Sequence, residues 1–151
     1  MDQLLSALQT IPEYNTLLTT LNEGLSAAVT GIGQINRSHI LASLSRRLHR
    51  PMVMVCQDDM AARRLQEELH SFLGQTVPIL PSRELTLYDT AVVSRAWEQK
   101  RLRQLLDLGM GKTPLQIITW DALSQRTMSP AVLRQAAFTL EPGREYPMDA
   151  L

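Results

Sequence analysis

The strongest candidate for a chemical site in this sequence is VTGIGQINRSHI, residues 29–40. Aligned on the phosphate-binding pattern G-x-x-x-x-G-K-S/T, Gly31 is the first glycine and Ser38 the last position, whereas Asn36 and Arg37 replace the second glycine and the lysine. Such a loop works because backbone N–H groups and a helix N-terminus surround the phosphates, while the lysine reaches the terminal phosphates and the hydroxyl binds magnesium. The segment therefore has the outline of a nucleotide site with two key positions changed.

Three interpretations remain once these two positions are changed: a working nucleotide site, a nucleotide site that has lost its function, and a chance match to the pattern. Asn36 tolerates a positive φ better than most residues, and Arg37 keeps the charge, although its planar fork does not replace a lysine inside the loop. Ser38 could still hold magnesium. We favour a plain strand-to-helix turn in which Asn36 or Ser38 is the N-cap.

A magnesium-dependent ATPase also needs an apolar strand that ends in paired acids. IITWDA ends in Asp121 but continues with Ala122, so we expect Asp121 to cap a helix. GMGKT, residues 109–113, contains Gly-Lys-Thr, but it follows an expected helix and precedes an expected strand, the reverse of a phosphate loop. We expect a helix-ending turn there and no working ATPase within these residues.

The elements that must position these residues read as two short helices followed by alternating strands and helices. This alternation predicts an α/β fold with a parallel sheet flanked by helices. The near-continuous apolar run at 50–57 predicts a strand buried on both faces. Helices are expected at 2–9, 12–24, 37–49, 58–74, 94–109, 121–126 and 129–136, and strands at 25–31, 50–57, 76–80, 115–120 and within 137–143, where a turn follows.

Composition sets further bounds. The 151 residues suggest one domain, and 44% hydrophobic with 20% charged residues is typical of a globular protein. Lys plus Arg and Asp plus Glu are 15 each, so the net charge predicts no strong non-specific attraction to nucleic acid. Cys56 is the only cysteine, which fits a reducing, cytoplasmic setting without an internal disulfide. We expect no secretory signal and no membrane span.

Two basic clusters and one aromatic residue are candidate surface contacts. Either cluster could touch a phosphate backbone or an acidic partner, although a solvated helix face is the usual explanation and the one we favour. The aromatic residue, Tyr88, lies in the expected long loop 81–92. The clusters are Arg46, Arg47, His49 and Arg50, and Lys100, Arg101 and Arg103.

Taken in order, four segments resemble one family. Residues 29–74 look like the start of the nucleotide-binding module shared by UvrB-type excision-repair helicases and the N-terminal region of transcription-repair coupling factor (Mfd). The segments ILPSRELTLYDT, SRAWEQKRLRQLLDL and LQIITWDALSQRTMSP are similar to its next three motifs. The changed phosphate loop, and a loop whose only aromatic is Tyr88, favour the coupling factor over UvrB.

The resemblance implies a degenerate P-loop NTPase domain, similar to domain 1 of UvrB and RecA, at 25–140. A helical extension at 1–24 would precede it, and 141–151 would begin a linker to a missing UvrA-binding subdomain. It implies no catalytic residue, metal or cofactor for this chain, since ATP and magnesium would serve separate motor domains of the parent. The alternatives are an active nucleotide-binding ATPase or helicase domain, and an unrelated α/β interaction domain.

The resemblance also implies partners. The coupling factor recognises RNA polymerase stalled at a DNA lesion and recruits UvrA through its UvrB-like region. This chain would then be a scaffold that packs on other domains of its parent. Contacts with UvrA, RNA polymerase and DNA would be made mainly by parts of the parent outside these residues, and no membrane is expected.

Overall fold

The computed structural model describes residues 2–82 and 95–146. It confirms the α/β class and the N-terminal helices. In chain order the elements are α1 (Asp2–Ala7), the 3-10 turn η1 (Leu8–Thr10), α2 (Pro12–Asn22), α3 (Gln34–Arg47), β1 (Met52–Cys56), α4 (Asp59–Leu73), β2 (Ile79–Leu80), α5 (Arg95–Gly109), β3 (Leu115–Thr119), α6 (Trp120–Ser124) and α7 (Pro130–Ala136).

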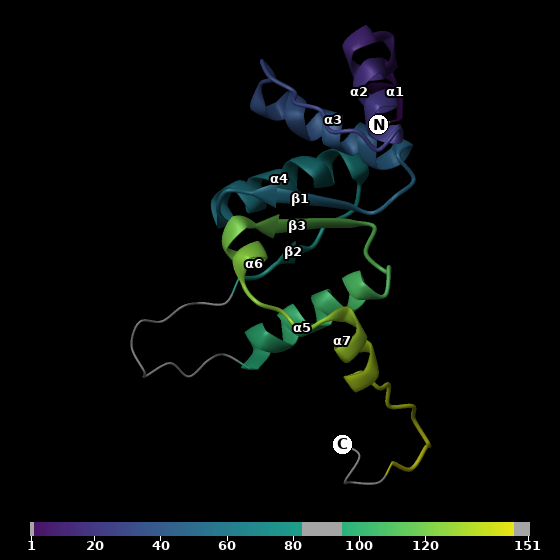
Figure 1. Ribbon diagram of the computed structural model, residues 1–151, viewed down its shortest axis with the longest axis vertical. Helices are drawn as coiled ribbons and strands as arrows, with labels where there is room; N and C mark the ends of the chain where they lie inside the picture. Colours follow the sequence, from purple (N-terminus) through teal and green to yellow (C-terminus); the bar gives the residue numbers. More distant parts are fainter. Residues whose placement is uncertain (1, 83–94, 147–151) are drawn as a thin grey trace.

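The sheet is parallel, as predicted, and has the strand order β1-β3-β2. Its three strands point the same way in Figure 1, and α6 begins directly where β3 ends. Ile117 in the central strand is in register with Met54 on one side and with Ile79 on the other. Every residue of β3 is buried, because strands flank it on both edges and helices cover both of its faces.

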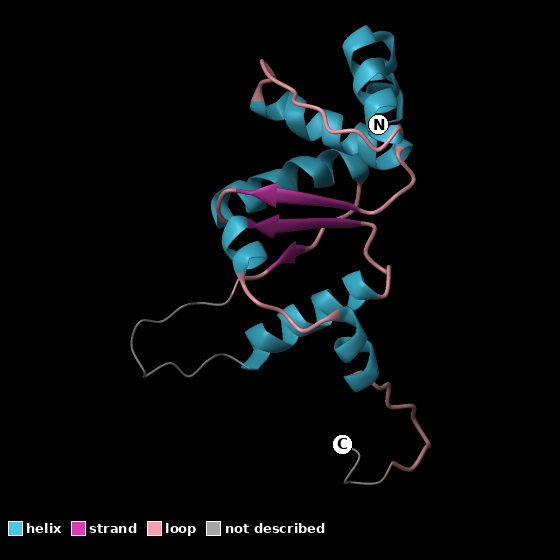
Figure 2. Ribbon diagram, in the orientation of Figure 1, coloured by secondary structure: helices cyan, strands magenta, loops and turns pink. Residues whose placement is uncertain are grey.

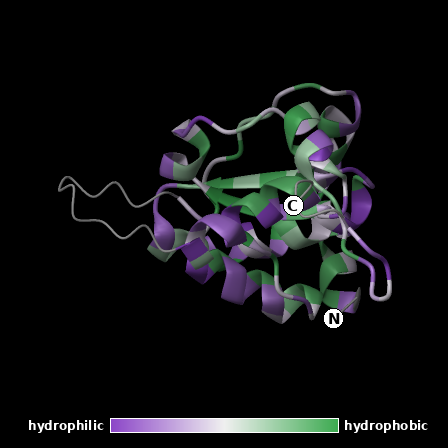
Figure 3. Ribbon diagram, turned by 90° about the horizontal axis from the view of Figure 1, so that it is seen from below, coloured by the Kyte–Doolittle hydropathy of each residue, from purple (hydrophilic) through white to green (hydrophobic). Residues whose placement is uncertain are grey.

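One face of the sheet is covered by α3 and α4. Helix α4 is held at both ends: the Asp58 carboxylate accepts a hydrogen bond from the Ala61 N–H at 2.7 Å, and Gly74 closes the helix with φ of 69°. The hydrophobic strands lie between helices with polar outer sides in Figure 3. The largest core cluster on this face contains Leu5, Ala42, Met54, Ala62, Leu69, Leu73, Val77, Leu115 and Ile117.

The second face of the sheet is only partly covered. Leu105 of α5 and Ala122 of α6 pack against Leu80 and Ile118. Val53 and Val55 of β1, which belong to this face by register, are each 50% exposed. The prediction that residues 50–57 form a strand buried on both faces is therefore wrong, because β1 is an edge strand whose Val53 and Val55 side chains are left half-exposed.

The N-terminal helices pack on α3. The Tyr14 hydroxyl lies 2.7 Å from Ser43 Oγ, which in turn donates to the Leu5 carbonyl at 3.1 Å. Tyr14 and Ser43 are buried, at 4% and 1% exposed. A single buried hydroxyl therefore ties α1, α2 and α3 together.

The expected strand at 25–31 is not formed. Figure 2 shows the connection between α2 and α3 as loop, and Leu25 and Val29 are 59% and 52% exposed. The segment runs beside α2 and lines a groove with Tyr14, Leu17 and Ile40. The run pairs with neither β1 nor β2, the edge strands of the described sheet, and contacts helices instead.

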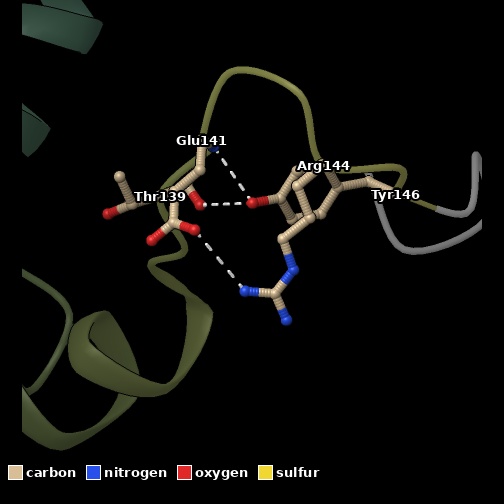
Figure 4. Close-up of polar contacts among 4 residues, drawn as sticks. All are labelled: Thr139, Glu141, Arg144 and Tyr146. Carbon is tan, nitrogen blue, oxygen red and sulfur yellow. Dashed lines mark hydrogen bonds and ion pairs between the residues drawn. The ribbon is translucent and has the colours of Figure 1, made fainter.

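The strand expected within 137–143 is also absent, although its turn is present. The Tyr146 hydroxyl donates to the Thr139 carbonyl at 3.2 Å and accepts from the Glu141 N–H at 3.0 Å (Figure 4). Arg144 lies 3.7 Å from the Glu141 carboxylate and beside the Tyr146 ring. These backbone groups are satisfied within the turn rather than by a neighbouring strand.

Candidate functional site

The turn before α3 is where the sequence places its strongest chemical candidate. Gly31 has φ of 75°, which favours glycine, and Gly33 is the N-cap of α3 without a side-chain hydrogen bond. The helix therefore starts at Gln34, and the prediction that Asn36 or Ser38 is the N-cap is wrong. The physical reason is that Gly33 already has the extended backbone of an N-cap, so the helix begins before Asn36 and Ser38.

Asn36 and Arg37 lie on the exposed first turn of α3. Asn36 has helical backbone and not a positive φ, since His49 is the non-glycine residue with positive φ within the described ranges. The Arg37 Nε donates back to the Ile32 carbonyl at 3.4 Å. In this arrangement residues 36 and 37 do not form the curled backbone with which a phosphate loop surrounds its ligand.

Ser38 is 1% exposed and faces α4. Its hydroxyl donates a short hydrogen bond to the Glu68 carboxylate. The group that would bind magnesium in a phosphate loop is thus already engaged in joining α3 to α4. Ser38 and Ala42 are four residues apart and both buried, so they lie on the same side of α3.

A depression of about 600 Å³ lies beside this turn. Arg64 donates to the Gln34 side chain across it at 3.3 Å. The helix N-terminus and Arg64 favour an anion there, whereas the Glu68 carboxylate opposes one. The depression is lined by Gly33, Gln34, Ile35, Asn36, Arg64 and Glu68.

Asp121 follows β3, and the prediction that it caps a helix is wrong. The N-cap is Thr119, whose Oγ1 accepts from the Ala122 N–H at 3.2 Å, while Asp121 is exposed in the first turn. Thr119 is 1% exposed, so the strand's last buried residue doubles as the helix cap. The turn at 109–113 is a helix-ending turn, as predicted, with Gly111 at φ of 69°.

The candidate surface residues fall into different environments. Arg46 and Arg47 are exposed in the last turn of α3, whereas Arg50 donates to the Leu21 carbonyl at the end of α2 at 2.7 Å. The Lys100 ammonium lies 5.8 Å from the centre of the Trp97 ring. Tyr88 lies outside the described residues.

Arg101 is the clearest correction among the candidate contacts. It is 6% exposed, and its guanidinium donates to the Pro81 carbonyl after β2 and to the Ala122 carbonyl in α6, the latter at 3.2 Å. It is a buried structural residue and not a surface contact. The signal in the sequence is its spacing of four from Trp97 and from Leu105, which places it on the apolar side of α5.

Cys56 ends β1 and is partly buried. Burial raises the pKa of its thiol, and the Asp58 carboxylate raises this pKa further. Among residues 2–82 and 95–146, no three His, Cys, Asp or Glu side chains are placed to share a metal ion. No helix within the same ranges is long and apolar enough to cross a membrane.

The parallel sheet, its helices on both faces and the glycine turn before α3 define a small α/β domain. No family profile matches the chain, and no solved structure matches it. The chain is 31% identical over 146 residues to the transcription-repair-coupling factor of Myxococcus xanthus. That match covers 91% of this chain and 12% of that protein's length. It confirms the resemblance inferred from the order of the four segments.

Proposed function

We propose that this chain is a non-catalytic, UvrB-like scaffold within a transcription-repair coupling factor, acting in the cytoplasm. In that role it would support recruitment of UvrA to RNA polymerase stalled at DNA damage. The observation that carries the proposal is the 31% identity to a transcription-repair-coupling factor over 91% of this chain. Because the chain spans 12% of that relative, ATP-driven translocation and most partner contacts would belong to other parts of such a protein.

The turn before α3 supports a role without ATP turnover. Three groups that a phosphate loop offers to its ligand are used differently: residue 36 is helical, Arg37 donates to the Ile32 carbonyl, and the Ser38 hydroxyl donates to Glu68. Nucleotide binding would require Ser38 to leave a buried position between two helices. A degenerate P-loop NTPase domain kept for its shape is the interpretation that best accommodates these contacts.

Calorimetric titration of the chain with Mg-ATP tests the non-catalytic part of the proposal. We expect no heat of binding above that of dilution and no release of phosphate. Binding with hydrolysis that Arg37→Ala abolishes would instead establish the alternative, an active nucleotide-binding domain.

The scaffold role is tested in the full-length parent protein. Met54→Asp places a carboxylate among the buried residues of this domain, where Met54 is 7% exposed. We expect lower capture of UvrA in a pull-down and retained ATPase activity, since the motor would be separate. Val29→Asp, at a position 52% exposed, is the matched control and should leave both unchanged. Retained UvrA capture by the Met54→Asp protein, with this domain shown to be unfolded by proteolysis, would overturn the scaffold role.

A further inference from the structure

A hollow of about 380 Å³ lies between α1 and the C-terminal half of α3, with basic residues on one side. The N-terminal helices stand over this part of α3 in Figure 1. Leu5 and Ser43 form buried parts of its wall, at 6% and 1% exposed. Its lining residues are Leu5, Ser6, Ser43, Arg46, Arg47 and His49.

The two arginines of this hollow are not used by the fold. Arg46 and Arg47 are exposed, and neither makes an ion pair with a carboxylate of the described ranges. Arg50 differs, because it holds the Leu21 carbonyl. The dipole of α3 favours cations in its last turn, so it stabilises the two unpaired arginines there. It does not account for the third basic residue that lines the hollow.

His49 is that residue, and its backbone is in the left-handed region with φ of 47°. It comes directly after Leu48, the C-cap of α3, at the position where glycine is the usual choice. Gly24 after α2 and Gly74 after α4 meet the same requirement with φ of 76° and 69°. At α3 the chain instead carries an imidazole in a conformation that L side chains rarely adopt, and this imidazole lines the hollow beside Arg46 and Arg47.

We propose that this hollow binds a short acidic segment of protein, whose carboxylates contact Arg46, Arg47 and His49 and whose aliphatic side chain packs on Leu5. Guanidinium forks match carboxylates with paired hydrogen bonds, and an imidazole N–H adds one donor in either protonation state. A nucleic acid fits less well, since the cations occupy one helix end rather than a track and no Phe, Tyr or Trp side chain lines the hollow to stack a base.

Fluorescence anisotropy with a labelled peptide EELEE tests the proposal. We expect binding to the chain that weakens as salt rises, and no binding of the same peptide with glutamine in place of each glutamate. Arg46→Ala/Arg47→Ala should weaken binding by about tenfold or more, the scale of lost charge-assisted hydrogen bonds.

His49→Gly separates binding from folding. Glycine relieves the left-handed backbone, so we expect an unchanged or raised melting temperature together with several-fold weaker binding. Arg126→Ala/Arg134→Ala removes the same charge from residues outside the hollow, one after α6 and one in α7, and should leave binding unchanged. The proposal is overturned if the wild-type chain does not bind EELEE or if His49→Gly binds it equally. It is also overturned if a thymidine oligonucleotide binds the same residues more tightly than the peptide.

Discussion

Two regions of this chain have the same predicted order of elements, an apolar strand, a turn and a helix, but they fold differently. Residues 50–73 become β1, an Asp58-capped turn and α4. Residues 25–47 become an exposed loop, a glycine turn and α3. Both helices form close to their predicted positions, so the difference lies in the strands and in the caps.

The difference shows that an apolar run becomes a strand only where a neighbouring strand satisfies its backbone. Met54 of β1 is in register with Ile117 and is 7% exposed in the main core. Val29 lies beside helices and is 52% exposed. The helix of each region is held differently as well: α4 by a side-chain cap, α3 by the buried Ser38–Glu68 hydrogen bond.

The largest expected effect on stability comes from truncating one apolar side chain to alanine in each of the two apolar runs. Met54→Ala should lower the free energy of unfolding by about 2–4 kcal/mol, because it leaves a cavity in the core. Val29→Ala should change it by less than about 0.5 kcal/mol, since the side chain is exposed. Urea denaturation followed by circular dichroism measures both. Equal losses would show that residues 25–31 are packed as firmly as β1.

Removing the hydroxyl that joins α3 to α4 should have the next largest effect. Ser38→Ala leaves the partly buried Glu68 carboxylate without this donor, and we expect a loss of about 1–2 kcal/mol in urea denaturation. Ser71→Ala is the control, because that exposed hydroxyl bonds only to the Glu67 carbonyl of its own helix. A loss at Ser38 no larger than at Ser71 would contradict the role of this contact in holding α3.

Substitutions at the two N-cap positions test how α4 and α3 begin. Asp58→Ala should cost about 1 kcal/mol, because the Ala61 N–H loses its acceptor. Gly33→Ser should stabilise the fold by about 0.3 kcal/mol, because the N-terminus of α3 gains the side-chain acceptor that it lacks. Thermal denaturation compares the two. A destabilising Gly33→Ser would mean that the turn before α3 needs glycine for a reason other than its cap.

The smallest effect concerns the thiol at the end of β1. Asp58→Asn keeps a capping oxygen but removes the charge that raises the Cys56 pKa, so alkylation by iodoacetamide at mildly alkaline pH should speed up modestly. Burial is the larger cause and remains, so the pKa should stay raised. Stability linked to this thiol is present below its ordinary pKa and is lost as pH rises toward the raised value. A slower reaction in Asp58→Asn would contradict this assignment.

Much of the fold was predictable because it depends on local rules. The helices expected at 58–74 and 129–136 were readable from the sequence, and Asp58 and Ser129 cap them. The parallel arrangement of the three strands that form was readable as well. The candidate site was less predictable. Its position at the start of α3 was readable, but the cap was not, because Gly33 makes no side-chain hydrogen bond there. The Ser38–Glu68 pair joins residues 30 positions apart, and the buried Arg101 donates to residues 20 and 21 positions away.

The helices, the parallel arrangement and the resemblance to a coupling factor follow from periodicity, capping and residue order, which are local properties of the sequence. The apolar runs that became strands could be recognised only in the folded chain, because strand pairing depends on a neighbour far along the chain. The tertiary structure also decided what the altered phosphate pattern contains: a glycine-capped helix whose serine is buried against Glu68. A hydroxyl's partner depends on the three-dimensional packing, which spacing alone does not specify.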